Sequence, residues 1–256
     1  MRFIIIFIAV LSFSLPALAD PPPPTQDSLS QAIFRFKTGE SGNIRWRECN
    51  RFIRGAEALA RAEEYAGYLM DEFARDPEFD PWRAAAIMAQ ESSFNRCAIS
   101  RAQWRTIREG FVAHYHREPT ERDIQSILRR SGLRRRLGAR QFDAGLAQFR
   151  WPGVAARRAG LTDPAALIDA RQNIHLTAVS FQHLRAYCDT HEGWSGVYTT
   201  RRGRTIRYRV SCEDAYWVRH NSPSRFNYRY YSSVNRRYRQ LLEYATTSTE
   251  ESDEHS

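Results

Sequence analysis

The 256-residue sequence contains a single lysine, Lys37, and it has only one long apolar run. That run extends from Phe3 to about Leu15, follows a basic residue, and is followed by Ala17-Leu18-Ala19, a small-x-small cleavage motif. Because the run is too short for a persuasive bilayer span, it predicts a cleaved signal peptide over 1–19, with an uncleaved anchor as the alternative. No cysteine follows the run as a lipid attachment point, so we expect a periplasmic or secreted protein.

Closely spaced cysteines are absent too, which argues against a zinc site. All four cysteines follow the predicted signal peptide, and an even number in an oxidising compartment favours two disulfides. Of the three possible pairings we favour Cys188–Cys212, because the 23 residues between them are predicted to form a hairpin that this bond would close. That choice leaves Cys49–Cys97. In the chain-entropy model, closing a loop of this size contributes on the order of 3 kcal/mol.

Negative charge is scarce beside positive charge: the net charge is +9, and nearly all of the basic residues are arginine. Four acids lie in 246–256, which predicts an acidic disordered tail; without this tail and without Arg2 of the predicted signal peptide, the folded part carries about +12. The segment 101–140 alone contains eleven arginines and carries +7. Such a protein could bind nucleic acid, anionic lipid or an acidic wall polymer. The predicted export argues against nucleic acid and favours peptidoglycan, whose peptides carry carboxylates.

Helical periodicity dominates the chain after the predicted signal peptide. Asp80-Pro81 predicts the N-cap and first residue of a helix that is apolar from Ala84 to Met88 and reaches Glu91. A helix this apolar is normally buried at the centre of a domain. The other predicted helices span 52–75, 120–128, 174–188, 214–220 and 231–244.

One segment has a different pattern: Val197–Val210 alternates around Arg202-Gly203, which predicts a β-hairpin. The prolines at 21–24 predict a linker or N-terminal extension over 20–45. About 237 residues remain after cleavage, enough for one domain with its own core. We therefore expect one mainly α domain over 46–245, in which 101–140 is a strongly basic segment.

Glu91 is the strongest candidate for chemistry. A carboxyl group at the end of a buried helix has few water contacts, which favours the protonated form that a general acid needs. Ser92 is placed to hydrogen-bond it, and Gln148, after a tight Gly-Leu turn, can donate to a sugar N-acetyl carbonyl. Asp143 has two interpretations. It caps the turn before Gly145, which we favour, or it faces Glu91 across a cleft and activates water.

The order of these motifs resembles that in the soluble lytic transglycosylases and goose-type lysozymes. Glu91-Ser92 matches the family's Glu-Ser motif. Gly145-Leu146-Ala147-Gln148 is similar to its Gly-Leu-Met-Gln motif, with Asp143 two residues before the glycine. Variants with this Asp occur among the transglycosylases of secretion and conjugation machineries, so the resemblance suggests a cell-envelope machinery as a further partner.

Later motifs extend the resemblance, which covers roughly 81–242. Gln172-Asn173-Ile174 resembles the family's Glu-Asn-Ile motif, Asn221 matches the asparagine of its Tyr-Asn-Ala-Gly motif, and Tyr230 matches a tyrosine of its final helix. Two departures are Ala147 in place of the usual Met and His220 before Asn221. A third is the length of 101–140, which exceeds the family's usual spacing between its first two motifs, so we interpret this segment as a basic helical insertion. The resemblance implies substrate contacts from Ser92, Gly145, Leu146, Ala147, Gln148, Asn221 and Tyr230.

The resemblance also implies a lysozyme-like fold and a reaction that needs one carboxylate and no metal or cofactor. Glu91 would cleave the β-1,4 bond from N-acetylmuramic acid to N-acetylglucosamine and leave a 1,6-anhydro product. Two alternatives stay open. One is a lysozyme-type hydrolase that uses Glu91 with Asp143, and the other is a non-catalytic peptidoglycan-binding scaffold, which the Ala147 and His220 departures support. We expect a monomer.

Overall fold

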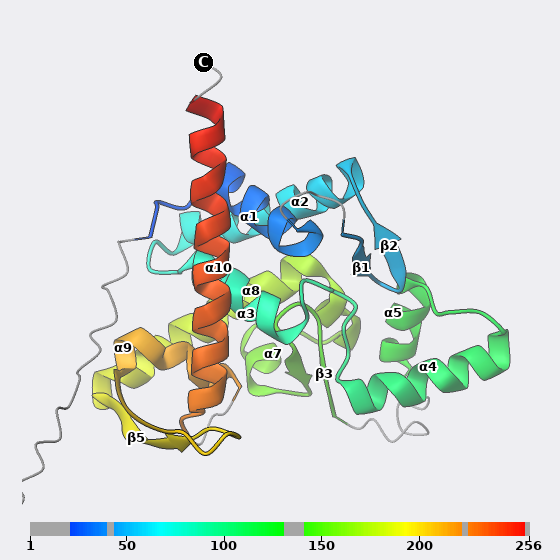
Figure 1. Cartoon of the computed structure of the whole chain (residues 1–256). Helices are drawn as coiled ribbons and strands as arrows, with labels where there is room; N and C mark the ends of the chain where they lie inside the picture. The colour runs from blue at the N-terminus through cyan, green and yellow to red at the C-terminus, as the bar shows by residue number, and fades with distance from the viewer. Residues whose placement is uncertain (1–20, 40–43, 131–140, 222–224, 254–256) are drawn as a thin grey trace, which may run out of the picture.

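The apolar helix that ends at Glu91 lies at the centre of the fold. The computed structural model describes residues 21–39, 44–130, 141–221 and 225–253 (Figure 1). The helix, α3, spans Pro81–Glu91, and the Asp80 carboxylate caps it by accepting the Arg83 N–H at 2.9 Å. Every residue over 84–89 is buried. The long helix α10, Tyr228–Asp253, packs against α3, so the central position predicted from composition is confirmed.

The segment predicted as a linker or extension contains a helix instead. Helix α1, Gln26–Thr38, begins at Thr25, which forms reciprocal capping hydrogen bonds with Ser28. Three of its apolar residues are fully buried, and it packs against α2, Ala56–Arg75, and against α10. An extended linker is therefore the wrong interpretation of 26–38, and the alternative of an N-terminal extension stays a prediction. Burial of the apolar face of α1 favours the helix over an extended linker.

The helix predicted from residue 52 starts later. Strand β1, Trp46–Glu48, pairs in antiparallel register with β2, Arg51–Ile53, and Phe52 in β2 is 59% exposed. Gly55 then adopts a positive φ of 54°, which glycine permits most readily, and α2 begins at the next residue. Phe52 matches the helical spacing, yet it belongs to a strand that ends before the glycine.

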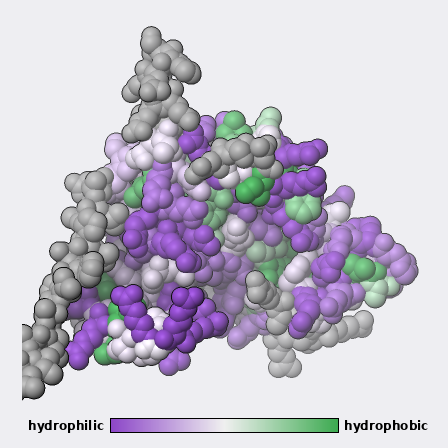
Figure 2. Space-filling model, in the orientation of Figure 1, coloured by the Kyte–Doolittle hydropathy of each residue, from purple (hydrophilic) through white to green (hydrophobic). Residues whose placement is uncertain are grey.

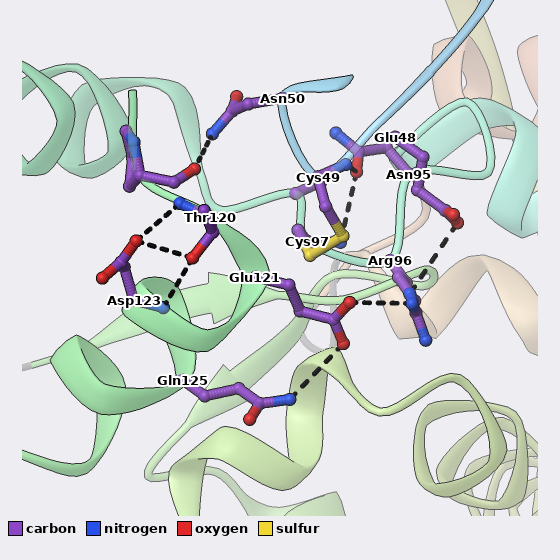
Figure 3. Close-up of a disulfide and its surroundings, with 12 residues drawn as sticks. Glu48, Cys49, Asn50, Asn95, Arg96, Cys97, Thr120, Glu121, Asp123 and Gln125 are labelled. Atoms are coloured by element: carbon purple, nitrogen blue, oxygen red, sulfur yellow. Dashed lines mark hydrogen bonds and ion pairs between the residues drawn. A yellow bond between two sulfur atoms is a disulfide. The ribbon is translucent and has the colours of Figure 1, made fainter. Parts of the chain in front are cut away.

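Both predicted disulfides are present. Cys49–Cys97 joins the turn between β1 and β2 to the loop that follows α3 (Figure 3). The side-chain oxygen of Asn95 accepts both cysteine N–H groups, at 3.1 and 3.2 Å. Beside the bond, Arg96 forms an ion pair at 2.8 Å with Glu121 (Figure 3). The disulfide and the ion pair together connect three parts of the chain that are distant in sequence.

The predicted hairpin extends beyond its expected bounds. Strands β5, Gly193–Thr199, and β6, Thr205–Ser211, are antiparallel, and Cys188–Cys212 closes their base. On the inner face, Trp194 stacks on Phe226 with ring centroids 5.0 Å apart. The outer face is mostly polar, with the exposed Val197 as an exception, and Figure 2 shows mostly hydrophilic side chains over the hairpin. Alternation of exposed and half-buried residues along both strands therefore confirms the period-two pattern.

The basic insertion is helical where the structure describes it. Helix α4, Arg101–Tyr115, projects to one side of the molecule (Figure 1), and α5, Glu121–Arg129, follows it. Thr120 caps α5 in a reciprocal bond with Asp123, and α5 packs against the 3-10 helix η1, Pro164–Ile168. The part of the insertion over 131–140 lies outside the described residues.

The remaining elements complete a mainly α structure, which confirms the predicted class. All three sheets of the described residues are two-stranded and antiparallel. Helix α10 continues to Asp253, so the tail predicted as disordered is helical over 246–253. Within the described ranges, no helix combines the length and apolar character that crossing a bilayer requires. The elements not yet given are β3 (Phe142–Ala144), β4 (Phe149–Trp151), α7 (Val154–Arg158), α8 (Ala170–Ala186), η2 (Tyr187–Thr190), α9 (Cys212–Ala215) and η3 (Tyr216–His220).

The sole lysine lies in a partly buried cluster of charged groups. Lys37 Nζ donates to Ser93 Oγ at 3.0 Å. Burial lowers the pKa of Lys37 to about 8, and the nearby Glu48 carboxylate partly offsets this effect. Glu48 is itself only 1% exposed; it forms an ion pair with Arg61 and accepts a hydrogen bond from Tyr65. The charged form of Lys37 is therefore less favourable in the folded protein than in the unfolded chain.

This shift predicts a pH-dependent stability difference for Lys37→Met. Because the folded pKa is about 8 and the unfolded value is 10.5, the unfolded chain binds more protons at this residue between those values. The wild-type free energy of unfolding, relative to that of Lys37→Met, is therefore expected to rise by on the order of 2 kcal/mol from pH 7.5 to pH 10.5. Urea unfolding of both proteins measures it, and a pH-independent difference would contradict the assignment.

Candidate active site

A groove of about 840 Å³ opens beside the C-terminal end of α3. Four residues predicted from the sequence line it: Glu91, Asp143, Gln148 and Asn221. They come from α3, β3, the turn before β4 and the residue after η3, and the rest of the lining comes mainly from α7 and α8. The fold therefore brings together side chains that are as much as 130 positions apart in the sequence.

Glu91 is only partly accessible, and its Oε1 atom is buried. The Tyr230 hydroxyl of α10 lies close by, although the two atoms do not meet hydrogen-bond geometry and neither has a partner among the described residues. Burial, and next the Glu91 carboxylate, raise the pKa of Tyr230 well above its ordinary value. The hydroxyl thus stays protonated at neutral pH. Buried polar atoms without a partner are rare and typical of functional sites.

The turn over 145–148 is held by a buried asparagine. Asn173 of α8 is fully buried; its Oδ1 accepts the Ala147 N–H at 2.8 Å, and its Nδ2 donates to the Leu167 carbonyl at 2.9 Å. Gly145 has a φ of +86°, and a Cβ there would lie 1.9 Å from the Leu167 oxygen. Only glycine fits this close approach, so the Gly-Leu pattern has a physical cause.

Loss of these contacts should destabilise the protein. We expect Asn173→Ala to lower the free energy of unfolding by about 2 kcal/mol, because it leaves the Ala147 N–H and the Leu167 carbonyl buried and unpaired. Urea denaturation measures the change. The matched control is Gln172→Ala, one residue earlier on the exposed face of the same helix, which is expected to change stability by less than about 0.5 kcal/mol. Equal losses in both variants would contradict this role.

Several residues predicted to contact substrate do not line the groove. Leu146 and Ala147 are fully buried, Gly145 is buried beneath Asn173, and Tyr230 lies behind Glu91 with 6% exposure. Ser92 Oγ donates to the Met88 carbonyl at 3.1 Å and not to Glu91, because it closes the last turn of α3. These residues therefore pack behind the lining of the groove and do not form part of it.

Gln148 lines the groove, but its amide is already engaged. Its Nε2 donates to the carbonyls of Ala98 and Gly145, at 3.0 and 2.9 Å. Both N–H groups are thereby used within the protein, so the predicted donation to a sugar N-acetyl carbonyl would require breaking one of them. The amide oxygen remains as an acceptor.

Asp143 faces the groove in an ion pair. Its two oxygens accept from Arg150 Nε at 2.9 Å and Nη2 at 3.2 Å, directly across the β3–β4 ladder. The Asp143 carboxylate also raises the pKa of Arg150, chiefly through these hydrogen bonds. The favoured prediction, that Asp143 caps the turn before Gly145, is wrong, because cross-strand register places a guanidinium opposite it.

His220 contributes to the site in a way that the sequence did not suggest. Its Nε2 lies 2.6 Å from the Ala147 carbonyl oxygen, and because a carbonyl only accepts, Nε2 carries the proton. The His220 ring also packs edge-on against Phe149, with centroids 4.8 Å apart. The turn is therefore held by Asn173 on one side and by His220 on the other. The sequence shows a histidine next to Asn221, but it does not show that this histidine contacts Ala147, which is 73 residues away.

No match to the chain is found among protein-family models, curated proteins or solved structures. The family resemblance therefore depends on the sequence motifs alone. Among the described residues, the one group of three potential metal ligands is Cys49, Cys97 and Glu121. Its two sulfurs form a disulfide, so this group does not suit a metal ion.

Proposed function

We propose that the protein is a peptidoglycan lytic transglycosylase with a lysozyme-like fold, exported to the periplasm or beyond the cell. The single observation that carries the proposal is the position of Glu91, which lines a groove while one of its carboxylate oxygens is buried beside a protonated tyrosine. A carboxyl group placed between groove and protein interior is suited to hold and return a proton. The two disulfides are typical of an oxidising compartment.

The proposed reaction uses Glu91 twice. As an acid, it protonates the oxygen between N-acetylmuramic acid and N-acetylglucosamine, and the bond to C1 breaks. The substrate's acetamido group stabilises the cationic sugar. As a base, the ionised carboxylate accepts the proton of the 6-hydroxyl, whose oxygen bonds to C1 and closes the 1,6-anhydro ring. The Tyr230 hydroxyl is a nearby donor for the ionised state.

The environment of Asp143 favours this route over hydrolysis. A lysozyme-type inverting enzyme needs a second carboxylate free to activate water, roughly 6.5–9.5 Å from the first. Asp143 lines the same groove and is the candidate, but Arg150 occupies both of its oxygens. Water activation at Asp143 would therefore have to displace a bidentate guanidinium. A non-catalytic scaffold is the remaining alternative.

Analysis of digested cell-wall sacculi by mass spectrometry tests the proposal. Products that end in 1,6-anhydro-N-acetylmuramic acid are expected, because the 6-hydroxyl and not water attacks C1. Reducing N-acetylmuramic acid ends would instead identify a hydrolase, and intact sacculi that still bind the protein would identify a scaffold. Sacculi incubated without protein supply the background of pre-existing anhydro ends.

A further inference from the structure

The groove contains a cluster of basic groups that the proposed reaction does not use. Arg158 on α7, His183 on α8 and Arg219 in η3 all line it, so three separate elements bring basic side chains to the same groove. Arg219 also lies over the Tyr187 ring, with its guanidinium carbon 3.7 Å from the centroid. This cation–π contact helps to hold the Arg219 charge in place.

Within the described part of the chain, these charges have no acidic partner. Neither Arg158 nor Arg219 forms an ion pair with a described carboxylate, whereas Arg150 in the same groove is paired with Asp143. The lining contains one other carboxylate, Glu91. Positive charges gathered in a concave surface raise the local concentration of anions and favour their binding.

The electrostatics of His183 agree with this arrangement. Burial, and next the guanidinium charges of Arg158 and Arg219, lower the pKa of His183. Both guanidinium groups therefore lie near enough to the His183 imidazole to lower its pKa. A bound anion would lie among three donors, and guanidinium groups match the two oxygens of a carboxylate.

We propose that Arg158, His183 and Arg219 form a carboxylate-binding subsite that recognises the peptide carried by a glycan strand in the groove. The inference rests on the proposed function, because it assigns the substrate class of the same groove: peptide-bearing strands with free carboxylates, in preference to amidated or peptide-free strands. The apolar side chains of Val154, Ala155 and Leu184 line the groove as well, where they can contact the peptide's methyl groups.

A binding experiment without turnover tests the subsite. The first probe is N-acetylglucosaminyl-N-acetylmuramyl dipeptide with a free terminal carboxylate. This compound lacks the linkage that the enzyme is proposed to cleave. The second probe is the same compound with its terminal carboxylate amidated. Isothermal titration with the whole protein is expected to give about 10-fold tighter binding of the carboxylate probe. Arg158→Gln and Arg219→Gln should each reduce this preference several-fold, and the double variant should abolish it. Arg207→Gln, an exposed arginine on the outer face of β6, is the matched control and should retain it.

An NMR titration of His183 provides an independent measurement. Binding of the carboxylate probe should raise the pKa of His183, because the anion offsets the two guanidinium charges, and the amidated probe should not. Equal affinity for both probes, or an undiminished preference in the double variant, would overturn the subsite. Failure of the proposed function is distinguishable: sacculi would yield no anhydro ends, while the carboxylate preference would persist.

Discussion

Glu91→Gln is expected to lower the release of anhydro-muropeptides from sacculi by about 10³-fold or more, since general acid–base catalysis alone contributes roughly 10²–10⁴-fold. Glutamine has nearly the same shape, but it cannot transfer the proton that both steps need. The groove retains its other lining residues, so binding of glycan fragments should change by less than about threefold. Chromatography of released products measures turnover, and titration with a non-cleavable fragment measures binding.

Two further variants make this result specific. Glu192→Gln changes an exposed glutamate outside the groove lining and should leave turnover unchanged. Asp143→Asn removes the charge paired with Arg150 but keeps the size of the side chain. If the protein is a transglycosylase, we expect this variant to release anhydro-muropeptides less than about 10-fold more slowly. If Asp143→Asn were as inactive as Glu91→Gln, the two-carboxylate hydrolase would be favoured. Full activity of Glu91→Gln would refute the site assignment.

Gly145→Ala is expected to reduce the free energy of unfolding by about 3 kcal/mol or more, or to prevent folding altogether. The added Cβ would lie 1.9 Å from the Leu167 oxygen and 2.1 Å from Asn173 Nδ2, both within a buried network. Neither atom can move without breaking its own hydrogen bond. Thermal and urea unfolding measure the loss, and the yield of folded protein gives the result if the variant is too unstable to purify.

Gly160→Ala is the matched control for this prediction. Gly160 also has a positive φ, of +68°, but no atom lies within 4 Å of the position that its Cβ would take. The substitution should therefore cost only the backbone strain, about 1 kcal/mol. A similar loss in both variants would mean that backbone conformation alone, and not the close approach to α8 and η1, explains the glycine.

Local patterns were sufficient to predict the central helix and the hairpin. Asp80-Pro81 and the apolar run after it specify both the start and the burial of α3, because capping and apolar composition act over a few residues. The preferred cysteine pairing followed from the same kind of argument, since the hairpin brings Cys188 and Cys212 together. Helix α1 shows the limit: its burial depends on α2 and α10, which local sequence does not reveal.

The site was predictable only in part, because side-chain partners depend on tertiary contacts. Glu91 and Gln148 line the same groove, yet the Gln148 amide donates to the carbonyl of Ala98, a residue 50 positions away, and to that of Gly145. The ion pair of Asp143 depends on the register of β3 and β4, which places Arg150 opposite it. The residues of the turn between the strands do not predict this register. The proposed subsite combines Arg158, His183 and Arg219 from three different elements, so no contiguous motif marks it.

The disulfide at Cys97 has a consequence for how the protein matures. It lies six residues beyond Glu91 and ties the loop after α3 to the β1–β2 turn. Before oxidation, only weaker contacts hold this loop, whose Ala98 carbonyl also anchors Gln148. We therefore expect oxidation of the two thiols to stabilise the loop that supports this side of the groove.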